Sequence, residues 1–329
     1  MRIVEGGMGM AEKRTERSPL FLKTVEWSMT ALFHLTRLLF YVLPPGLFYA
    51  LFRAMGAALL YLRPGMRRRL EAKISDALPE ITDRREVTRI ARQACASVFL
   101  PILDIFTLGR YGERYMRELR LEGKENLARA EEAGKGIIFI GPHIGGVAIV
   151  HAVMARLGKP YTPIMYRPED TAVPRYVEHL AFYAGFLGCD LEEPVFLAGK
   201  DIIPKVREHL SRGKRIGLTF DVPGTGVVEF FGRPAALAAG AGYFAYDTGA
   251  PILPFCLLRG KGVFDNRLVF FPPIFCDTAG EKKAEVARVM REVVKAGEKT
   301  IRMAPGQWMS WFGLWAWWDQ ARELLEKGA

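Results

Sequence analysis

The pattern of hydrophobic and polar residues changes character along the chain, from helical periods before Glu122 to short apolar runs alternating with amphipathic stretches after it. The apolar runs predict strands at Gly136–Ile140, Tyr161–Tyr166, Arg215–Phe220, Pro251–Leu258 and Arg267–Phe271. The amphipathic stretches predict helices at Ile144–Leu157, Pro174–Phe186, Asp201–Arg212, Ala236–Thr248 and Glu281–Arg302. This alternation predicts an α/β fold with a mostly parallel sheet flanked by helices.

An almost continuously apolar stretch runs from Trp27 to Leu62, with Pro44 and Pro45 in its middle. A spanning helix needs about 20 largely apolar residues, and the proline pair divides this stretch into two shorter helices. We interpret it as an N-terminal helical membrane anchor, either a hairpin or a monotopic element. A single kinked span and a pair of buried core helices are the alternatives. A basic cluster follows this stretch: Arg63, Arg67, Arg68, Arg69 and Lys73. At a membrane surface these side chains would contact anionic headgroups, but a solvated helix face would have the same sequence pattern.

The chain is therefore expected to comprise four segments. Residues 1–26 are a polar tail without the features of a cleaved signal peptide. Residues 27–65 are the anchoring helices, residues 66–121 a helical layer, and residues 122–329 the α/β core with an aromatic C-terminal segment. Five tryptophans in that last segment could lie at headgroup depth, although packing against the sheet explains the first two equally well: Trp308, Trp311, Trp315, Trp317 and Trp318.

Composition narrows the choice of partners. The 329 residues, 50% of them hydrophobic, can form one large core, and 46 basic against 36 acidic residues give a net charge of +10. That charge predicts an anionic partner. Nucleic acid is not expected, because the basic residues flank apolar segments. No two of the four cysteines form a CxxC pair, which fits a protein on the reducing, cytoplasmic side of a membrane. The histidines lack the spacing of metal ligands. The sequence contains no phosphate-binding glycine motif, so no nucleotide cofactor is expected.

One predicted strand ends in small residues and a histidine, in the sequence Gly141-Pro142-His143-Ile144-Gly145-Gly146. A strand that delivers an imidazole to the carboxyl edge of a sheet can present a general base. The backbone N–H groups of Gly145 and Gly146 would lie nearby and could stabilise an oxyanion. A histidine at a strand end, taken alone, is more often structural.

Five segments in order carry a family resemblance: Pro142–Gly146, Tyr166–Pro168, Thr219–Asp221, Phe230–Ala235 and Pro305–Trp311. Their order and spacing resemble the lysophospholipid acyltransferase superfamily, and within it the bacterial lipid A biosynthesis (lauroyl/myristoyl) acyltransferases. The resemblance covers roughly residues 25–315 and is most specific from Asp221 to Pro234. No single segment would have sufficed.

The resemblance implies a membrane-bound O-acyltransferase on the cytoplasmic face of a bacterial inner membrane. It would move a fatty acyl chain from acyl-carrier protein, or acyl-coenzyme A, to a hydroxyl of a lipid A precursor or a related glycolipid or lysophospholipid. No metal or other cofactor is implied. His143 would be the base, and Arg167 and Arg233 would hold the acceptor's phosphate. The remaining expected residues would line the substrate pocket: Phe230, Phe231, Gly232 and Pro234.

The sequence departs from the family pattern at Ala148, five positions after His143, where the family has a carboxylate that orients the imidazole. Another acid could take that role, the chain could be catalytically impaired, or the fold could bind lipid without chemistry. Asp221 is our candidate for the replacement, because adjacent parallel strands bring their carboxyl ends together. Asp221 could equally be a turn-forming residue before Val222-Pro223.

Overall fold

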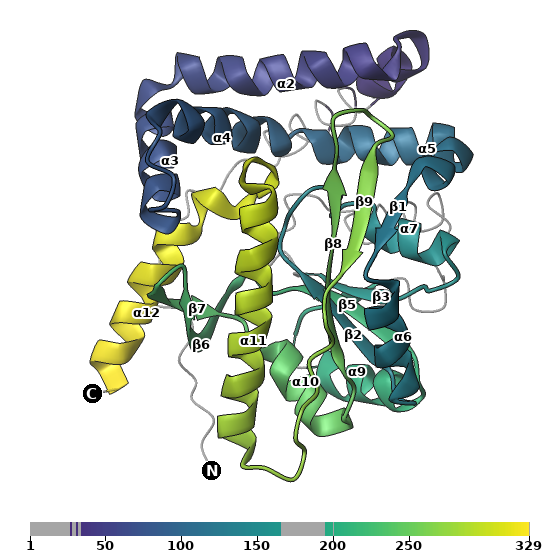
Figure 1. The fold of residues 1–329 in the computed structure, drawn as a ribbon, viewed down its shortest axis with the longest axis vertical. Coiled ribbons are helices and arrows are strands. Elements are labelled where there is room, and N and C mark those ends of the chain that lie inside the picture. The colour runs from purple at the N-terminus through teal and green to yellow at the C-terminus, as the bar shows by residue number, and fades with distance from the viewer. Residues whose placement is uncertain (1–26, 28–30, 32–33, 166–194, 200, 329) are drawn as a thin grey trace.

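A mainly parallel sheet forms the centre of the computed structural model, which describes residues 27, 31, 34–165, 195–199 and 201–328 (Figure 1). Within these residues the sheet has seven strands in the order β1-β9-β8-β2-β5-β3-β4. They are β1 (Arg120–Glu122), β2 (Ile137–Gly141), β3 (Thr162–Met165), β4 (Phe196–Leu197), β5 (Arg215–Thr219), β8 (Ile252–Arg259) and β9 (Asn266–Phe270). Only the β8–β9 pairing is antiparallel. A separate antiparallel hairpin joins β6 (Pro223–Phe230) to β7 (Arg233–Leu237).

Helices form two groups around this sheet. Before it come a helical stretch at residues 34–42, α2 (Pro45–Leu62), α3 (Pro64–Ala77), α4 (Arg84–Ser97) and α5 (Leu100–Glu118). Within and after it come α6 (Lys124–Glu132), α7 (Val150–Arg156), α9 (Ile202–Ser211), α10 (Gly240–Thr248), α11 (Lys282–Met303) and α12 (Leu314–Gly328). Two short 3₁₀ turns, η1 (Pro305–Gln307) and η2 (Ser310–Phe312), precede α12.

Alternate residues of β2 show that both faces of the sheet are covered. Ile138 and Ile140 belong to the core shared with α9, α10 and α11, whereas Ile137 and Phe139 belong to the core shared with α6 and α7. A strand buried on both faces must be apolar throughout, as this one is. The α/β class, with a mainly parallel sheet and flanking helices, is therefore confirmed.

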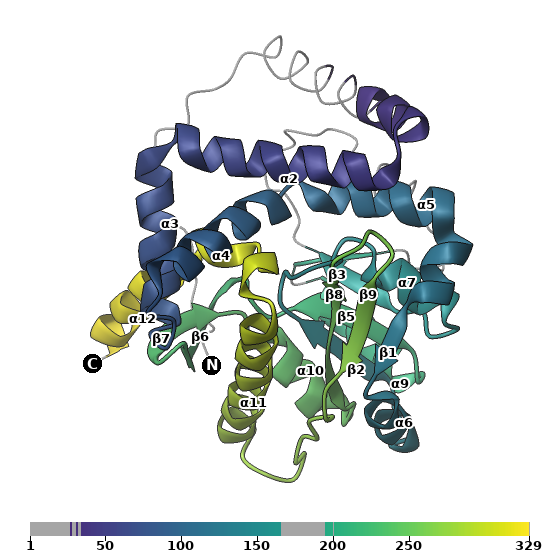
Figure 2. The same cartoon turned by 45° about the horizontal axis from the view of Figure 1, so that its top comes forward.

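The N-terminal helices lie over one end of the sheet. Figures 1 and 2 show α2 running alongside α4 and α5. A Cβ atom at Gly56 of α2 would lie 2.5 Å from the Ala96 Cα atom of α4, so glycine permits this close crossing. Helix α2 is long and apolar enough to cross a membrane, although core helices of soluble proteins can have the same length and hydropathy. In this structure 22% of α2 is buried.

The observed elements correct several predicted boundaries. The helix expected from Ile144 begins at Val150, because Ile144 forms a bridge with Trp308 and residues 145–149 form turns. The helix expected from Ala236 begins at Gly240, because the preceding residues belong to β7 of an unpredicted hairpin. Strand β1 begins at Arg120, two residues before the expected start of the α/β core at residue 122. The predicted helix Pro174–Phe186 and the tail at residues 1–26 lie outside the described residues.

The C-terminal tryptophans contribute to the core. Trp308 and Trp311 are fully buried, and Trp317 and Trp318 are nearly so. They lie with Phe230 and Phe231 in one aromatic cluster. Core packing therefore accounts for four of the five tryptophans, and the expected band at headgroup depth is wrong for them.

Candidate active site

His143 and Asp221 meet at the carboxyl edge of the sheet. Strands β2 and β5 are parallel neighbours, with Gly141 opposite Thr219, so the residues that follow them emerge side by side. The His143 Nδ1 atom lies 2.8 Å from Asp221 Oδ1. The structure thus brings together the two residues that the sequence singled out as base and acid.

The Asp221 carboxylate is buried and accepts hydrogen bonds from three groups. Besides the His143 ring, the His143 backbone N–H donates to both oxygens at 3.1 and 3.0 Å, and Trp308 Nε1 donates to Oδ2 at 2.8 Å. A carboxylate held in this way can only accept from His143 Nδ1. That nitrogen therefore carries the imidazole proton, and Nε2 carries the lone pair.

His143 Nε2 is placed to act on a substrate. Thr219 Oγ1 lies 3.5 Å from it, longer than an ordinary hydrogen bond, and the His143 side chain is 37% exposed. Burial by itself lowers the pKa of His143, but the charge of Asp221 and its hydrogen bond outweigh that effect and raise the pKa. A neutral imidazole whose conjugate acid is stabilised by a buried carboxylate has the properties that a general base needs.

The backbone N–H groups of Gly145 and Gly146 already have acceptors. Gly145 N donates to Gln307 O at 3.3 Å and Gly146 N donates to Leu257 O at 2.8 Å. Gly145 also has a φ of +56°, and a Cβ atom there would lie 2.1 Å from Leu257 O. These glycines allow the loop to lie against β8. The sequence had predicted that both N–H groups would bind an oxyanion, but in this arrangement both already donate to backbone carbonyls.

Ala148 lies in the turns between His143 and α7, so it is not one helical turn away from His143. The position on Nδ1 where an orienting carboxylate would act is filled by Asp221, which comes from the neighbouring strand. The site therefore contains a carboxylate–imidazole pair despite the alanine.

Residues 14–315 match the family described as bacterial lipid A biosynthesis acyltransferase. The chain belongs to this family. The match confirms the resemblance found in the sequence and establishes the chain as an acyltransferase-family member. No curated protein matches it. Among solved structures it is similar to the crystal structure of the 1-acyl-sn-glycerophosphate (LPA) acyltransferase, PlsC, from Thermotoga maritima. The identity is 15%, the coverage is 77% of this chain and 98% of that chain, and the TM-score is 0.35, from which we draw no conclusion.

In this acyltransferase-family member, the two phenylalanines of the block Phe230–Pro234 pack beside the site within the core. Phe230 and Phe231 are buried, and their ring centroids lie 5.8 and 5.9 Å from that of Trp308, the indole that holds Asp221. Phe231 has a φ of +52°, and its N–H donates to Glu298 Oε1 at 2.6 Å. Both rings were expected to line the substrate pocket, but they pack within the core instead, whereas Gly232 and Pro234 are exposed.

Arg233 lies among other partners. Its guanidinium stacks over Trp318 at 4.5 Å, and Nη2 lies 3.8 Å from an oxygen of Asp76. It lines a cavity of about 600 Å³ between α3 and α12, and the described residues around that cavity include neither His143 nor Asp221. Arg167, the other expected phosphate ligand, lies outside the described residues.

Three residues contribute to the site although no role there was predicted for them: Trp308, Thr219 and Gln307. Trp308 was noted as one of five tryptophans and as part of the segment Pro305–Trp311, but neither pattern says which indole N–H has a carboxylate partner. Thr219 could have been found from its place two residues before Asp221. Within the described residues, no group of His, Cys, Asp or Glu side chains is arranged to hold a metal ion.

Proposed function

We propose that the protein is a membrane-bound O-acyltransferase that moves a fatty acyl chain from an acyl-carrier thioester to a hydroxyl of a lipid A precursor, or of a related glycolipid or lysophospholipid. Membership of the acyltransferase family supports the class of reaction. The observation that carries the proposal is the 2.8 Å contact between His143 Nδ1 and buried Asp221, which leaves Nε2 as a base.

His143 Nε2 takes the proton of the acceptor hydroxyl while the hydroxyl oxygen attacks the carbonyl carbon of the thioester. Asp221 stabilises the imidazolium that results. When the tetrahedral intermediate collapses, the new C–O bond to the acceptor is retained, the carbonyl re-forms and the C–S bond breaks. The leaving thiolate then receives the proton from His143, which returns to its neutral form. The thioester supplies the driving force, so the step needs no metal or nucleotide.

The substrates follow from the family and from the charge of the chain. Acyl-carrier protein is the proposed donor, with acyl-coenzyme A as the alternative, and a net charge of +10 suits either anionic partner. Arg167 and Arg233 are the proposed ligands of the acceptor's phosphate. If Arg233 has this role, the phosphate lies in the cavity between α3 and α12, apart from the reacting hydroxyl. The proposed location is the cytoplasmic face of a bacterial inner membrane.

The test is an acyl-transfer assay with purified protein, both donors, and glycolipid and lysophospholipid acceptors. His143→Ala should abolish transfer. Asp221→Asn should lower kcat by about 10⁴-fold, the loss seen when the corresponding acid of a serine protease is replaced. Glu208→Gln is the matched control, because this exposed carboxylate on α9 does not line the cavity that contains Arg233 and should be dispensable. Full activity of His143→Ala would contradict the proposal.

The same assay separates this function from lipid binding without chemistry, which the missing carboxylate at position 148 had suggested. Because Asp221 already occupies His143 Nδ1, the wild type should be active and Ala148→Glu should bring no gain. An inactive wild type that Ala148→Glu restores would show that Asp221 does not replace the family's acid. A wild type that binds lipid but transfers nothing, with or without this substitution, would favour the non-catalytic function.

A further inference from the structure

Residues 307–309, here termed the clamp, lie against the loop that carries His143. Gly145 N donates to Gln307 O at 3.3 Å, Met309 N donates to His143 O at 2.9 Å, and Ile144 and Trp308 form an antiparallel bridge. The clamp also carries the Trp308 indole that donates to Asp221. One short segment therefore contacts both members of the proposed catalytic pair.

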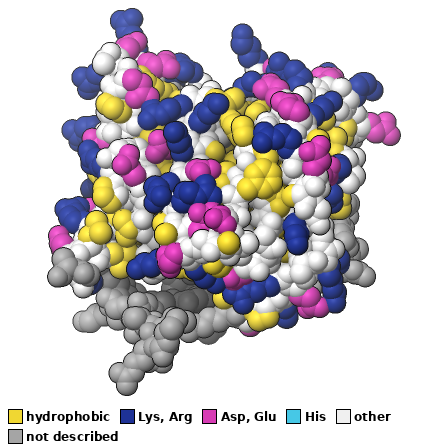
Figure 3. Space-filling view, turned by 60° about the horizontal axis from the view of Figure 1, so that its bottom comes forward, with side chains coloured by type: hydrophobic (Ala, Val, Ile, Leu, Met, Phe, Trp, Pro, Cys, Tyr) yellow, Lys and Arg dark blue, Asp and Glu magenta, His cyan; other side chains and the backbone are white. Residues whose placement is uncertain are grey.

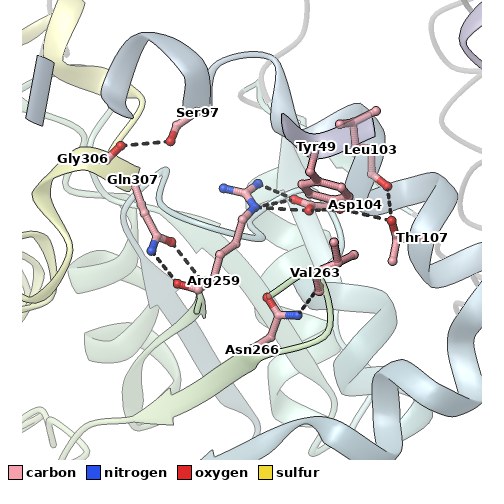
Figure 4. Close-up of polar contacts among 10 residues, drawn as sticks. All are labelled: Tyr49, Ser97, Leu103, Asp104, Thr107, Arg259, Val263, Asn266, Gly306 and Gln307. Carbon is pink, nitrogen blue, oxygen red and sulfur yellow. Dashed lines mark hydrogen bonds and ion pairs between the residues drawn. The ribbon is translucent and has the colours of Figure 1, made fainter. Parts of the chain in front are cut away.

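The Gln307 side chain fixes the clamp to the end of β8 (Figure 4). Its Nε2 atom donates to Arg259 O at 2.7 Å, and its Oε1 atom accepts from Arg259 N at 2.9 Å. This reciprocal pair uses both polar ends of the amide on the backbone of one residue. A side chain held at both ends has a single orientation, so the backbone of Gln307 is held in place as well.

Arg259 is itself immobilised from the helical layer. Its Nε atom lies 3.1 and 3.2 Å from the two oxygens of Asp104 on α5, and Nη2 donates to the same carboxylate. Tyr49 on α2 donates to Asp104 at 2.8 Å (Figure 4). Both charged side chains are almost fully buried, and within the described part of the chain Nη1 has no partner. A buried ion pair resists displacement, because separating its partners leaves an uncompensated charge.

We propose that Gln307 is a positioning residue for the His143–Asp221 pair, holding the clamp and its Trp308 indole in register from an anchor on Arg259. The inference rests on the proposed function, since it assigns a role to Gln307 through the base and acid named there. Gln307 makes no contact with the imidazole or the carboxylate itself, so it acts only through the clamp. Misplacing reacting groups by about 1 Å can cost about 10²-fold in rate.

The test is the isosteric change Gln307→Met in the full-length protein in detergent, which removes both hydrogen bonds and keeps the volume. We expect kcat to fall by about 10- to 100-fold with little change in KM. The pKa of His143, followed by NMR among the five histidines and assigned from its absence in His143→Gln, should also fall. Asp221 is the charged group that raises this pKa, and loosening the contact lets the opposing effect of burial prevail.

Gln320→Met is the matched control, because the Gln320 amide also donates to a backbone oxygen, that of Gly224 at 3.2 Å, away from the clamp. It should leave both the kcat and the His143 pKa unchanged. A Gln307→Met protein with the wild-type His143 pKa and kcat would overturn the positioning role, even if its melting temperature fell. An active His143→Ala protein would instead overturn the proposed function, and the positioning role with it.

Discussion

Two histidines eight residues apart show how local surroundings set opposite proton affinities. Burial lowers the pKa of His151 on α7 to about 4, whereas the charge of Asp221 outweighs burial and raises the pKa of His143. His151 therefore contributes stability that is complete above about pH 6.5, the value for an unperturbed histidine, and is lost as the pH falls toward 4. His143 does the reverse, contributing stability that is complete below pH 6.5 and is lost as the pH rises through its raised pKa.

We predict that His151→Gln will lose less stability on acidification than the wild type, because glutamine cannot be protonated. Between pH 8 and pH 4 the difference should approach about 3 kcal/mol, because the pKa of His151 falls from 6.5 to about 4 and each tenfold change in proton affinity corresponds to about 1.36 kcal/mol. Denaturant unfolding at the two pH values measures it. His143→Gln should lose more than the wild type over the same interval. If both variants match the wild type, these shifts do not contribute to stability.

The role of Asp221 could be predicted from the sequence, but its full surroundings could not. Its pairing with His143 could be expected because both residues follow strands that were predicted to be parallel, and parallel strands end at one edge. The donation from Trp308 could not, since it depends on how a segment 87 residues away returns to that edge. The Gly145 and Gly146 N–H groups were assigned wrongly, because their carbonyl partners come from η1 and β8, which no local pattern reveals.

At the level of elements, strands β2 and β8 were predictable because each is a mostly apolar run buried on both faces. The hairpin of β6 and β7 was missed because β6 begins Pro223-Gly224-Thr225-Gly226, and proline and glycine disfavour strand interiors. Tertiary contacts override that preference. A Cβ atom at Gly224 would lie 2.5 Å from the backbone of Ala238, so this glycine allows the chain to pass close by.

The crossing of α2 over α4 gives an element-scale prediction. Gly56→Ala should lower the stability by about 1–3 kcal/mol, because the new methyl group meets the backbone of Ala96 and the helices must separate. Helix propensity alone would favour alanine by up to about 1 kcal/mol, so a loss can come only from packing. Thermal unfolding measures it. Gly46→Ala, in the same helix with nothing within 4 Å, is the control and should be neutral or slightly stabilising. Equal melting temperatures for the two variants would contradict the close crossing.

At the scale of the whole molecule, exposed apolar side chains gather on the N-terminal helices, whereas charged side chains are interspersed on the face shown in Figure 3. On the face in Figure 3, basic and acidic side chains are interspersed, so the net charge of +10 is not gathered there into one patch. Exposed large apolar side chains are instead concentrated in the N-terminal helices: Leu35, Leu38, Leu39, Tyr41, Val42, Leu47, Leu51, Met55, Tyr61 and Leu62. Their opposite sides are covered, since Phe40 and Phe48 are fully buried against α5. An apolar face of this extent on a helix that also contacts the core favours a monotopic element over a span.

We predict that this face binds lipid and that charging it releases the protein without unfolding it. Leu47 and Leu51 lie one turn apart on α2 and are more than half exposed, so Leu47→Glu combined with Leu51→Glu should leave the melting temperature unchanged. The pair should weaken binding to vesicles containing phosphatidylglycerol by about tenfold per leucine, because each loses most of its transfer free energy. Vesicle co-sedimentation at fixed salt measures the change. The control combines Ile203→Glu on α9 with Phe275→Glu between β9 and α11, two exposed apolar residues outside both the N-terminal helices and the cavity that contains Arg233. If the control pair reduces binding as much as the α2 pair, the membrane contact lies elsewhere and the monotopic anchor is wrong.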